Sequence, residues 1–187
     1  MDEDLKIAME VLREGGIILY PTDTIWGIGC DATNPAAVQR VYQIKKRADN
    51  KSMLVLVDSE SRLMQYVDQV PEVAWQLIGV SIKPLTIIYQ GAKNLAPNLI
   101  AENGSVGIRI PRDDFCRELI SRFRKPVVST SANISGHKAP ALFPEIEDGI
   151  ISSVDYVVNW RRNDLIPREA SSVIELRSGG EIRIIRE

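Results

Sequence analysis

Histidine, cysteine and long apolar runs are scarce in this chain, and each scarcity excludes a class of protein. The 2 cysteines and the single histidine are too few for a disulfide framework or a His/Cys zinc site. No apolar run approaches the length that crosses a bilayer, and the acidic first residues are unlike a signal or transit peptide. We therefore expect a reduced, cytoplasmic protein with no membrane segment and no metal held by its own side chains.

The common motifs for phosphate binding and nucleophilic catalysis are absent as well. The chain holds no G-x-x-x-x-G-K-[ST] loop, no G-x-G-x-x-G turn and no G-x-S-x-G elbow. Gly27 and Gly29 lie in a strand-like stretch, which favours close packing over phosphate binding. A triad of His137 with Ser131 or Ser135 is disfavoured, because a lone histidine in a loop is more often a bystander. Any nucleotide would therefore be bound by side chains and irregular loops.

Charge and aromatic content argue against a protein that binds long nucleic acids. The 187 residues include 23 Lys and Arg against 25 Asp and Glu, a net charge of −2 at pH 7. Such a balance does not hold a polyanion by charge alone. Trp26, Trp75 and Trp160 are isolated in the sequence and predict no aromatic platform for stacking bases. We expect at most weak RNA binding.

Hydrophobic residues make up 44% of the chain, and their spacing alternates between helical and strand-like patterns. The pattern predicts helices over 5–12, 34–46, 59–67, 71–79 and 115–123. It predicts strands over 17–20, 25–30, 53–57, 84–89, 105–110, 126–128, 156–158, 172–176 and 182–185. Proline and glycine are not pooled into a linker. The sequence therefore predicts a single α/β domain over residues 1–187.

Cations gather at the end of the second predicted helix, as Lys45, Lys46, Arg47 and Lys51. Cations at a helix C-terminus complement the helix dipole and are often simply solvated. Lys45, however, continues the apolar face of that helix, so Lys45 and Arg47 would form a fork suited to a polyphosphate. Both interpretations stay open on the spacing alone.

Small hydroxyl and amide residues follow two predicted strands. Residues 129–136 run Ser-Thr-Ser-Ala-Asn-Ile-Ser-Gly, and residues 21–24 run Pro-Thr-Asp-Thr. Ligands in α/β sheets gather at the carboxyl ends of strands, where such residues let phosphate or carboxylate oxygens approach the backbone. Turns whose side chains bond their own backbone are the alternative. Arg109, opposite the apolar face of its strand, and Ser171, at the start of a late strand, are further candidates.

Taken together and in order, these segments resemble the YrdC family, whose characterised members are L-threonylcarbamoyladenylate synthases. The resemblance covers essentially the whole chain. It rests on Pro-Thr-Asp-Thr-Ile-Trp-Gly-Ile-Gly-Cys-Asp-Ala from Pro21, Lys45-x-Arg47, Val-Gly-Ile-Arg-Ile-Pro over 106–111, Ser-Thr-Ser-Ala-Asn-Ile-Ser-Gly over 129–136, and Ser-Ser-Val from Ser171. It implies a twisted mixed α/β sheet flanked by helices, with a positively charged groove.

The resemblance implies that L-threonine, bicarbonate or CO2, and ATP with Mg2+ are joined into threonylcarbamoyl-AMP, with release of pyrophosphate. A tRNA threonylcarbamoyl transferase would then use this product to modify the adenosine next to the anticodon. The scarcity of acid–base residues agrees with this chemistry. A carbamate is already an anionic nucleophile, so the reaction needs positioning and cations instead.

The resemblance also implies roles for individual residues. L-Threonine would contact Thr24, Arg109, Ser129 and Ser171; ATP would contact Arg47, Lys51, Ser105, Ser131 and Arg186; and the catalytic set would be Lys45, Arg47, Ser131 and Asn133. Because Lys45 and Arg47 would lie at a helix end outside the core, replacing either by alanine should abolish product formation and leave the fold intact.

Departures from the family pattern keep an alternative open. Ala48 stands where relatives commonly have a proline after Lys-x-Arg, and Lys51-Ser52-Met53 replaces Asn-Pro-Leu. A lysine in that loop also occurs in the YciO-like branch of the family. A nucleotide-binding paralogue with a different acceptor is therefore the first alternative. A non-catalytic RNA-binding module is the second, which the charge and aromatic content disfavour.

Overall fold

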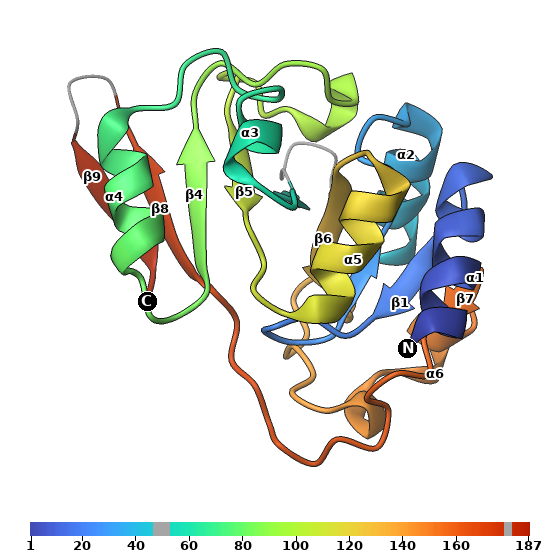
Figure 1. The fold of residues 1–187 in the computed structure, drawn as a ribbon. Helices are drawn as coiled ribbons and strands as arrows, with labels where there is room; N and C mark the ends of the chain where they lie inside the picture. The colour runs from blue at the N-terminus through green and yellow to red at the C-terminus, as the bar shows by residue number, and fades with distance from the viewer. Residues whose placement is uncertain (47–52, 178–180) are drawn as a thin grey trace.

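The computed structural model describes residues 1–46, 53–177 and 181–187, and these form one sheet of nine strands flanked by helices (Figure 1). The strands are β1 (Ile18–Tyr20), β2 (Gly27–Gly29), β3 (Leu54–Leu56), β4 (Leu85–Tyr89), β5 (Val106–Arg109), β6 (Val127–Ser131), β7 (Tyr156–Val157), β8 (Ser172–Leu176) and β9 (Ile182–Arg186). The helices are α1 (Asp2–Arg13), α2 (Pro35–Ile44), α3 (Glu60–Leu63), α4 (Glu72–Val80), α5 (Asp114–Phe123) and α6 (Asp148–Ile151), with short 3-10 helices η1 (Pro97–Leu99) and η2 (Phe143–Glu145).

The strand order is β7-β1-β2-β6-β3-β5-β4-β8-β9, so strands far apart in the sequence are neighbours in the sheet. The β3–β5 and β4–β8 pairs are parallel, whereas β6 pairs antiparallel with both β2 and β3. The predicted mixed α/β sheet is therefore confirmed. This order places β5, which ends at Arg109, two strands away from β6, which ends at Ser131. It also places β5 two strands away from β8, which begins directly after Ser171.

The helices cover the sheet by burying two sets of alternating strand residues. Ile18 and Tyr20 of β1 pack with the apolar faces of α1 and α5, which lie side by side (Figure 1). Ile17 and Leu19 belong to the other cluster, with the apolar face of α2. Successive side chains of a strand point to opposite faces, so one short strand supplies both cores.

Capping residues explain where the helices that flank the site begin. The Asn34 side chain accepts from the backbone N–H groups of Ala36 and Ala37, and Pro35 occupies the first turn of α2. Asp113 caps α5 by accepting from the N–H of Cys116 at 3.0 Å. Burial raises the pKa of Asp113 above the ordinary carboxyl range, although its hydrogen bond from Cys116 acts in the opposite direction.

Two predicted elements end three or more residues away from the expected position. The helix predicted over 59–67 is the single turn α3, because Tyr66 and Val67 pair instead with the segment at Ala92. The strand predicted over 126–128 extends to Ser131, since β6 pairs with β3 and β2 along its whole length. The hydroxyls of residues 129–131 therefore belong to a strand and not to a loop.

A long connection runs from β7 at one end of the sheet to β8 near the other, crossing below the sheet in Figure 1. Arg162 anchors its start by donating to the carbonyl oxygens of Val157 and Val158. Arg161 donates to the carbonyl of Thr22 at 3.1 Å, so the connection also supports the turn after β1. None of the described helices is long and apolar enough to cross a membrane.

Candidate active site

A pocket of about 330 Å³ lies over one face of the sheet. Alternate residues of the strands line it, including Gly107 and Arg109 of β5 and Ser129 and Ser131 of β6. Residues i and i+2 of a strand point to the same face, so the pocket opens on the face of the sheet. Arg109 and Ser131 are the last residues of β5 and β6, so the pocket also reaches the carboxyl ends of these two strands.

The charged and polar groups of this pocket are mainly hydrogen-bond donors. Of the described residues that line it, Arg109 and Arg186 carry a charge, and both are cations. Partial burial and the positive charge of Arg109 lower the pKa of Arg186. The hydroxyls of the lining come from Thr24, Thr86, Ser129, Thr130, Ser131 and Ser171. Guanidinium and hydroxyl donors suit an anionic ligand such as a carboxylate or a phosphate.

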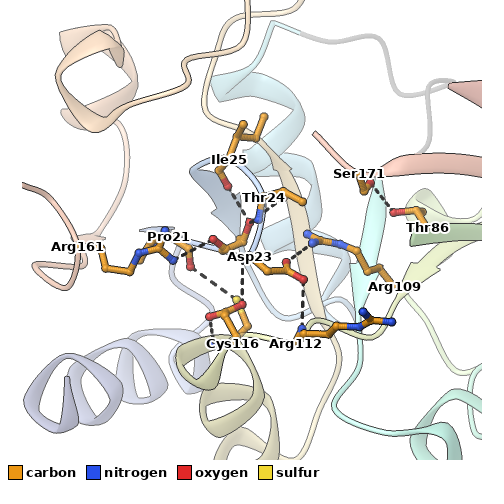
Figure 2. A network of polar contacts seen from close by, with 12 residues as sticks. Pro21, Asp23, Thr24, Ile25, Thr86, Arg109, Arg112, Cys116, Arg161 and Ser171 are labelled. Atoms are coloured by element: carbon orange, nitrogen blue, oxygen red, sulfur yellow. Dashed lines mark hydrogen bonds and ion pairs between the residues drawn. The ribbon is translucent and has the colours of Figure 1, made fainter. Parts of the chain in front are cut away.

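Arg109 is held in the pocket by an ion pair with Asp23, from the turn after β1 (Figure 2). The second carboxylate oxygen of Asp23 accepts the backbone N–H of Arg112 at 3.1 Å. The backbone N–H of Asp23 donates to Asp113 at 3.0 Å, which ties the turn to the start of α5. Arg109 is only 3% exposed, and its Nε has no hydrogen-bond partner among the described residues. The guanidinium is thus buried, oriented and not saturated by the residues that the structure describes.

The turn after β1 brings the Thr24 hydroxyl into the lining of the same pocket, with the Thr22 hydroxyl beside it. Thr22 Oγ1 lies 2.8 Å from Thr24 Oγ1 and 2.8 Å from the carbonyl oxygen of Ile25. Thr22 is 1% exposed and Thr24 is 6% exposed, and Thr24 lines the pocket. Figure 2 shows the turn between Arg161 on one side and Arg109 on the other.

A second pair of hydroxyls comes from β4 and from the residue just before β8, the strand that pairs parallel with β4. Thr86 Oγ1 lies 2.8 Å from Ser171 Oγ, and both residues are almost fully buried. Arg186, from the last strand, donates through Nε to the Ser171 carbonyl at 2.9 Å. The two residues touch, so a ligand at Ser171 and a ligand at Arg186 would lie next to each other, as the predicted contacts with L-threonine and ATP require.

Lys45 lies behind the pocket and braces the segment that follows β6. Its Nζ donates to the carbonyl oxygens of Ser131 and Asn133. Asn133 in turn donates through Nδ2 to the carbonyl of His137 at 2.7 Å. Lys45 leans toward the protein body as expected, but it is 1% exposed. The expectation that Lys45 lies outside the core is wrong, because the end of α2 is covered by the segment after β6.

Other predicted residues lie elsewhere. Ser105 donates its hydroxyl to Asn103 at 2.7 Å before β5 begins, and it does not line this pocket. Arg47 and Lys51 lie outside the described residues. His137 is exposed, with its Nδ1 2.8 Å from the Glu147 carboxylate, as expected of a bystander.

Trp26, isolated in the sequence, packs against a second aromatic ring in the fold. Its ring centroid lies 4.8 Å from that of Phe143, at an interplanar angle of 55°. The guanidinium of Arg162 lies over the other ring, 5.2 Å from the centroid of Phe143. Trp26 also lines the pocket. The pocket therefore has an aromatic wall that is supported from behind by the long connection.

The sequence model of the Sua5/YciO/YrdC family, described as telomere recombination, matches residues 10–187. The chain belongs to the Sua5/YciO/YrdC family. The threonylcarbamoyl-AMP synthase of Pseudoalteromonas translucida is 30% identical over 158 residues, which cover 83% of this chain and 84% of that protein. The family resemblance found in the sequence is thereby confirmed.

Two solved structures of the Sua5/YciO/YrdC family share this fold. E. coli YciO matches with a TM-score of 0.86 and 25% identity, covering 100% of this chain and 90% of that chain. P. abyssi Sua5 complexed with L-threonine matches with a TM-score of 0.86 and 22% identity, covering 97% of this chain. This chain covers 53% of that P. abyssi chain, about half its length. The likeness to P. abyssi Sua5 shows the fold alone.

Sequence reasoning missed three residues that shape the site of this Sua5/YciO/YrdC domain. Asp23 and Thr22 lie inside the Pro-Thr-Asp-Thr turn that was singled out, so the motif was a sufficient signal for them. Thr86 gave no such signal, because it is one threonine within an apolar strand. Only the pairing of β4 with β8 brings Thr86 next to Ser171.

Proposed function

We propose that this protein is an L-threonylcarbamoyladenylate synthase, an enzyme that forms threonylcarbamoyl-AMP and pyrophosphate from L-threonine, bicarbonate or CO2, and ATP. The observation that carries the proposal is the convergence of separate segments on one pocket. The converging residues are Thr24, Arg109, Ser129, Ser131, Ser171 and Arg186. Family membership and the relative named threonylcarbamoyl-AMP synthase support the proposal.

In this proposal Arg109 binds the carboxylate of L-threonine. Its side chain is buried, is aimed by Asp23 and keeps an unpartnered Nε among the described residues. A buried guanidinium binds a carboxylate strongly and with a defined orientation. Thr24, Ser129 and Ser171 surround the rest of the amino acid. P. abyssi Sua5, which shares the fold, has been solved in complex with L-threonine, and this agrees with an amino-acid substrate.

ATP occupies the remaining part of the pocket, next to Ser131 and Arg186. Arg47 and Lys51 are proposed phosphate contacts from the family resemblance, and so is Ser105, which stands outside the pocket lining. The pocket together with the approach from the end of α2 would form the positively charged groove. Mg2+ would enter with ATP, bound by the phosphate oxygens, because this ion retains water and phosphate ligands readily.

The chemistry needs no acid–base residue of unusual strength. The amine nitrogen of L-threonine bonds to the carbon of CO2 and loses a proton, which gives a carbamate. A carbamate oxygen then bonds to the α-phosphorus of ATP while the bond to pyrophosphate breaks. The protein contributes alignment of the two substrates and cations against the developing charge. Lys45 acts indirectly, because it holds the segment of Ser131 and Asn133 in place.

The product is a mixed anhydride, so a tRNA threonylcarbamoyl transferase is the proposed consumer. Any direct contact with RNA is proposed to be weak, given the net charge of −2. The free, buried thiols of Cys30 and Cys116 fit a reducing compartment, and we propose the cytoplasm.

Pyrophosphate release tests the proposal directly. The protein is incubated with ATP and Mg2+, and L-threonine and bicarbonate are each added or omitted. We expect release that requires both, together with threonylcarbamoyl-AMP detected by mass spectrometry. Release of pyrophosphate that does not depend on L-threonine or on bicarbonate, or no release at all, contradicts the proposed activity.

Neighbouring serines give a matched pair of variants for the same assay. Ser171 is 3% exposed and lines the pocket, whereas Ser172 lies outside its lining. We expect Ser171→Ala to raise the KM for L-threonine and Ser172→Ala to leave it unchanged. Equal effects of the two substitutions would contradict the placement of L-threonine in this pocket.

The YciO-like alternative keeps the nucleotide and changes the acceptor. It is favoured by the match to E. coli YciO over the full length of this chain. The same assay, repeated with the other amino acids and with small carboxylic acids, separates the two functions. Release driven by another acceptor and not by L-threonine would assign this chain to the alternative.

A further inference from the structure

The hydrogen bonds between the two threonines of the turn have a fixed direction. Thr22 Oγ1 lies 2.8 Å from the carbonyl oxygen of Ile25, which can only accept, so the single hydroxyl proton of Thr22 is used there. Thr22 Oγ1 also lies 2.8 Å from Thr24 Oγ1. With the Thr22 proton committed to Ile25, the proton in this second contact has to come from Thr24.

Thr22 is thereby saturated. It donates once, and it accepts both the Thr24 hydroxyl and the Thr24 backbone N–H, the latter at 3.0 Å. A hydroxyl has one proton and two lone pairs, so the Thr24 oxygen retains only lone pairs for another partner. Thr24 lines the pocket, and it therefore presents an acceptor there. Free rotation would otherwise let a threonine hydroxyl donate or accept.

We propose that Thr22 is a positioning residue that makes the Thr24 hydroxyl a fixed hydrogen-bond acceptor. The subsite at Thr24 then selects a ligand group that donates a hydrogen bond. On the facing side, the Arg109 guanidinium only donates, so it selects a group that accepts. The two subsites together admit an amino acid in one orientation, with its carboxylate at Arg109 and an N–H or O–H group at Thr24.

This inference rests on the proposed function in naming L-threonine as the ligand. L-Threonine offers two donors, the amine and the β-hydroxyl, and two analogues separate them. L-2-Aminobutyrate lacks the hydroxyl, and 3-hydroxybutyrate of matching configuration lacks the amine. A buried polar group that loses its partner discriminates strongly between such analogues.

The test measures binding of L-threonine and both analogues by calorimetry, in bicarbonate-free buffer with ATP and Mg2+ present. Thr22→Val keeps the side-chain shape and removes the hydroxyl that orients Thr24. We expect L-threonine to bind roughly tenfold more weakly, with its preference over one analogue reduced toward unity. The KM for ATP should stay within about twofold, because the change concerns the amino-acid subsite.

Three further variants keep the result interpretable. Thr24→Val removes the acceptor itself and should lose the same preference, whereas Thr22→Ser retains the hydroxyl and should restore it. Thr33→Val is the matched control, because its hydroxyl bonds Asp31 at 2.6 Å and lies outside the pocket lining. Equal weakening of all three ligands by Thr22→Val, or none, would overturn the inference.

Pyrophosphate release by the unmodified protein separates this inference from the proposed function. Threonine-dependent release with an unchanged preference in Thr22→Val and Thr24→Val means that the function stands and the inference is wrong. If the unmodified protein neither binds L-threonine nor releases pyrophosphate with it, the proposed function and this orientation of L-threonine both fail.

Discussion

The guanidinium of Arg109 is ion-paired with the carboxylate of Asp23, which lies 86 positions earlier in the chain. Both side chains are largely removed from solvent, at 2% and 10% exposure. Removal of one partner from a buried pair leaves an uncompensated charge, which destabilises far more than the pair stabilises. The same ion pair therefore stabilises the fold and orients the guanidinium of Arg109 in the pocket.

Replacing Asp23 by alanine is expected to lower the free energy of unfolding by about 3–5 kcal/mol, because buried Arg109 loses its counter-charge. Asp23→Asn keeps an oxygen for the Arg112 N–H and should recover part of the loss. Urea unfolding followed by circular dichroism measures both. The control is Asp68→Asn, which breaks an exposed pair with Lys93 and should change stability by less than about 1 kcal/mol. Equal midpoints for Asp23→Ala and the control would contradict the coupling.

Lys45 and Lys46 are adjacent cations that should respond very differently to replacement. Lys45 is 1% exposed and donates to two carbonyl oxygens, whereas Lys46 is exposed. Lys45→Met should destabilise the protein by about 2 kcal/mol or more, because hydrogen bonds to charged groups each contribute roughly 1.5–3 kcal/mol. Lys46→Gln should leave the melting temperature within a degree or two of the unmodified value.

Synthase activity is measured for Lys45→Met and Lys46→Gln alongside their stability. Lys45→Met should lose synthase activity even at a temperature where it is fully folded, because the segment of Ser131 and Asn133 is no longer held. Full activity in folded Lys45→Met would refute the positioning role of this lysine.

Replacing Gly29 by alanine is expected to lower the stability of the protein, whereas replacing Gly79 by alanine is expected to raise it. A Cβ on Gly29 would lie 2.6 Å from Tyr20 Cε1 and 2.8 Å from the Val128 carbonyl oxygen. Overpacking of this kind destabilises by about 1–3 kcal/mol. A Cβ on Gly79, inside α4, meets nothing within 4 Å, so alanine should stabilise by up to about 1 kcal/mol through helix propensity. Differential scanning calorimetry measures both, and a stabilised Gly29→Ala variant would contradict the packing.

Asp4 should make stability depend on pH in the acid range. Burial alone would raise its pKa, but hydrogen bonds from the Tyr156 hydroxyl and the Asn159 and Trp160 N–H groups outweigh burial and lower the pKa. A carboxyl whose folded pKa is lowered stabilises above its unfolded pKa of about 4, and this contribution disappears as the pH falls through the folded pKa.

Asp4→Asn should therefore lower the free energy of unfolding by about 1–3 kcal/mol at pH 7. The difference from the unmodified protein should shrink below about pH 4. Asp2→Asn, in the same helical turn but with an 84% exposed side chain, is the control and should show little effect at any pH. A difference for Asp4→Asn that grows as the pH falls would contradict this assignment.

The order of the elements could be predicted from the sequence because it depends on local periodicity. Helix α2 follows from Asn34-Pro35 and the apolar spacing after it, and β5 follows from alternation around Gly107. There are two exceptions. The short helix α6 was not predicted, and the helical pattern after Leu63 is replaced by pairing with the segment at Ala92. A contact distant in the sequence is not visible in a local pattern.

The candidate site could be predicted only in its residue types. The turn at Thr24, the strand hydroxyls and Arg109 were visible as polar groups beside apolar strands, and the family resemblance ordered them. Burial of Lys45 was not visible, because it depends on the segment after β6 folding over the end of α2. Ser105 was assigned by resemblance, and its distance from the pocket lining depends on where β5 begins.

The sequence by itself determined most of the strands and the longer helices, and it supplied the hydroxyls and cations, because these depend on periodicity and side-chain chemistry. The tertiary structure decided which of them meet. The Arg109–Asp23 pair and the Thr86–Ser171 pair join residues 86 and 85 positions apart. Such contacts arise from the strand order of the sheet and its registers, which are set by the packing of both faces against helices and not by any local run of residues.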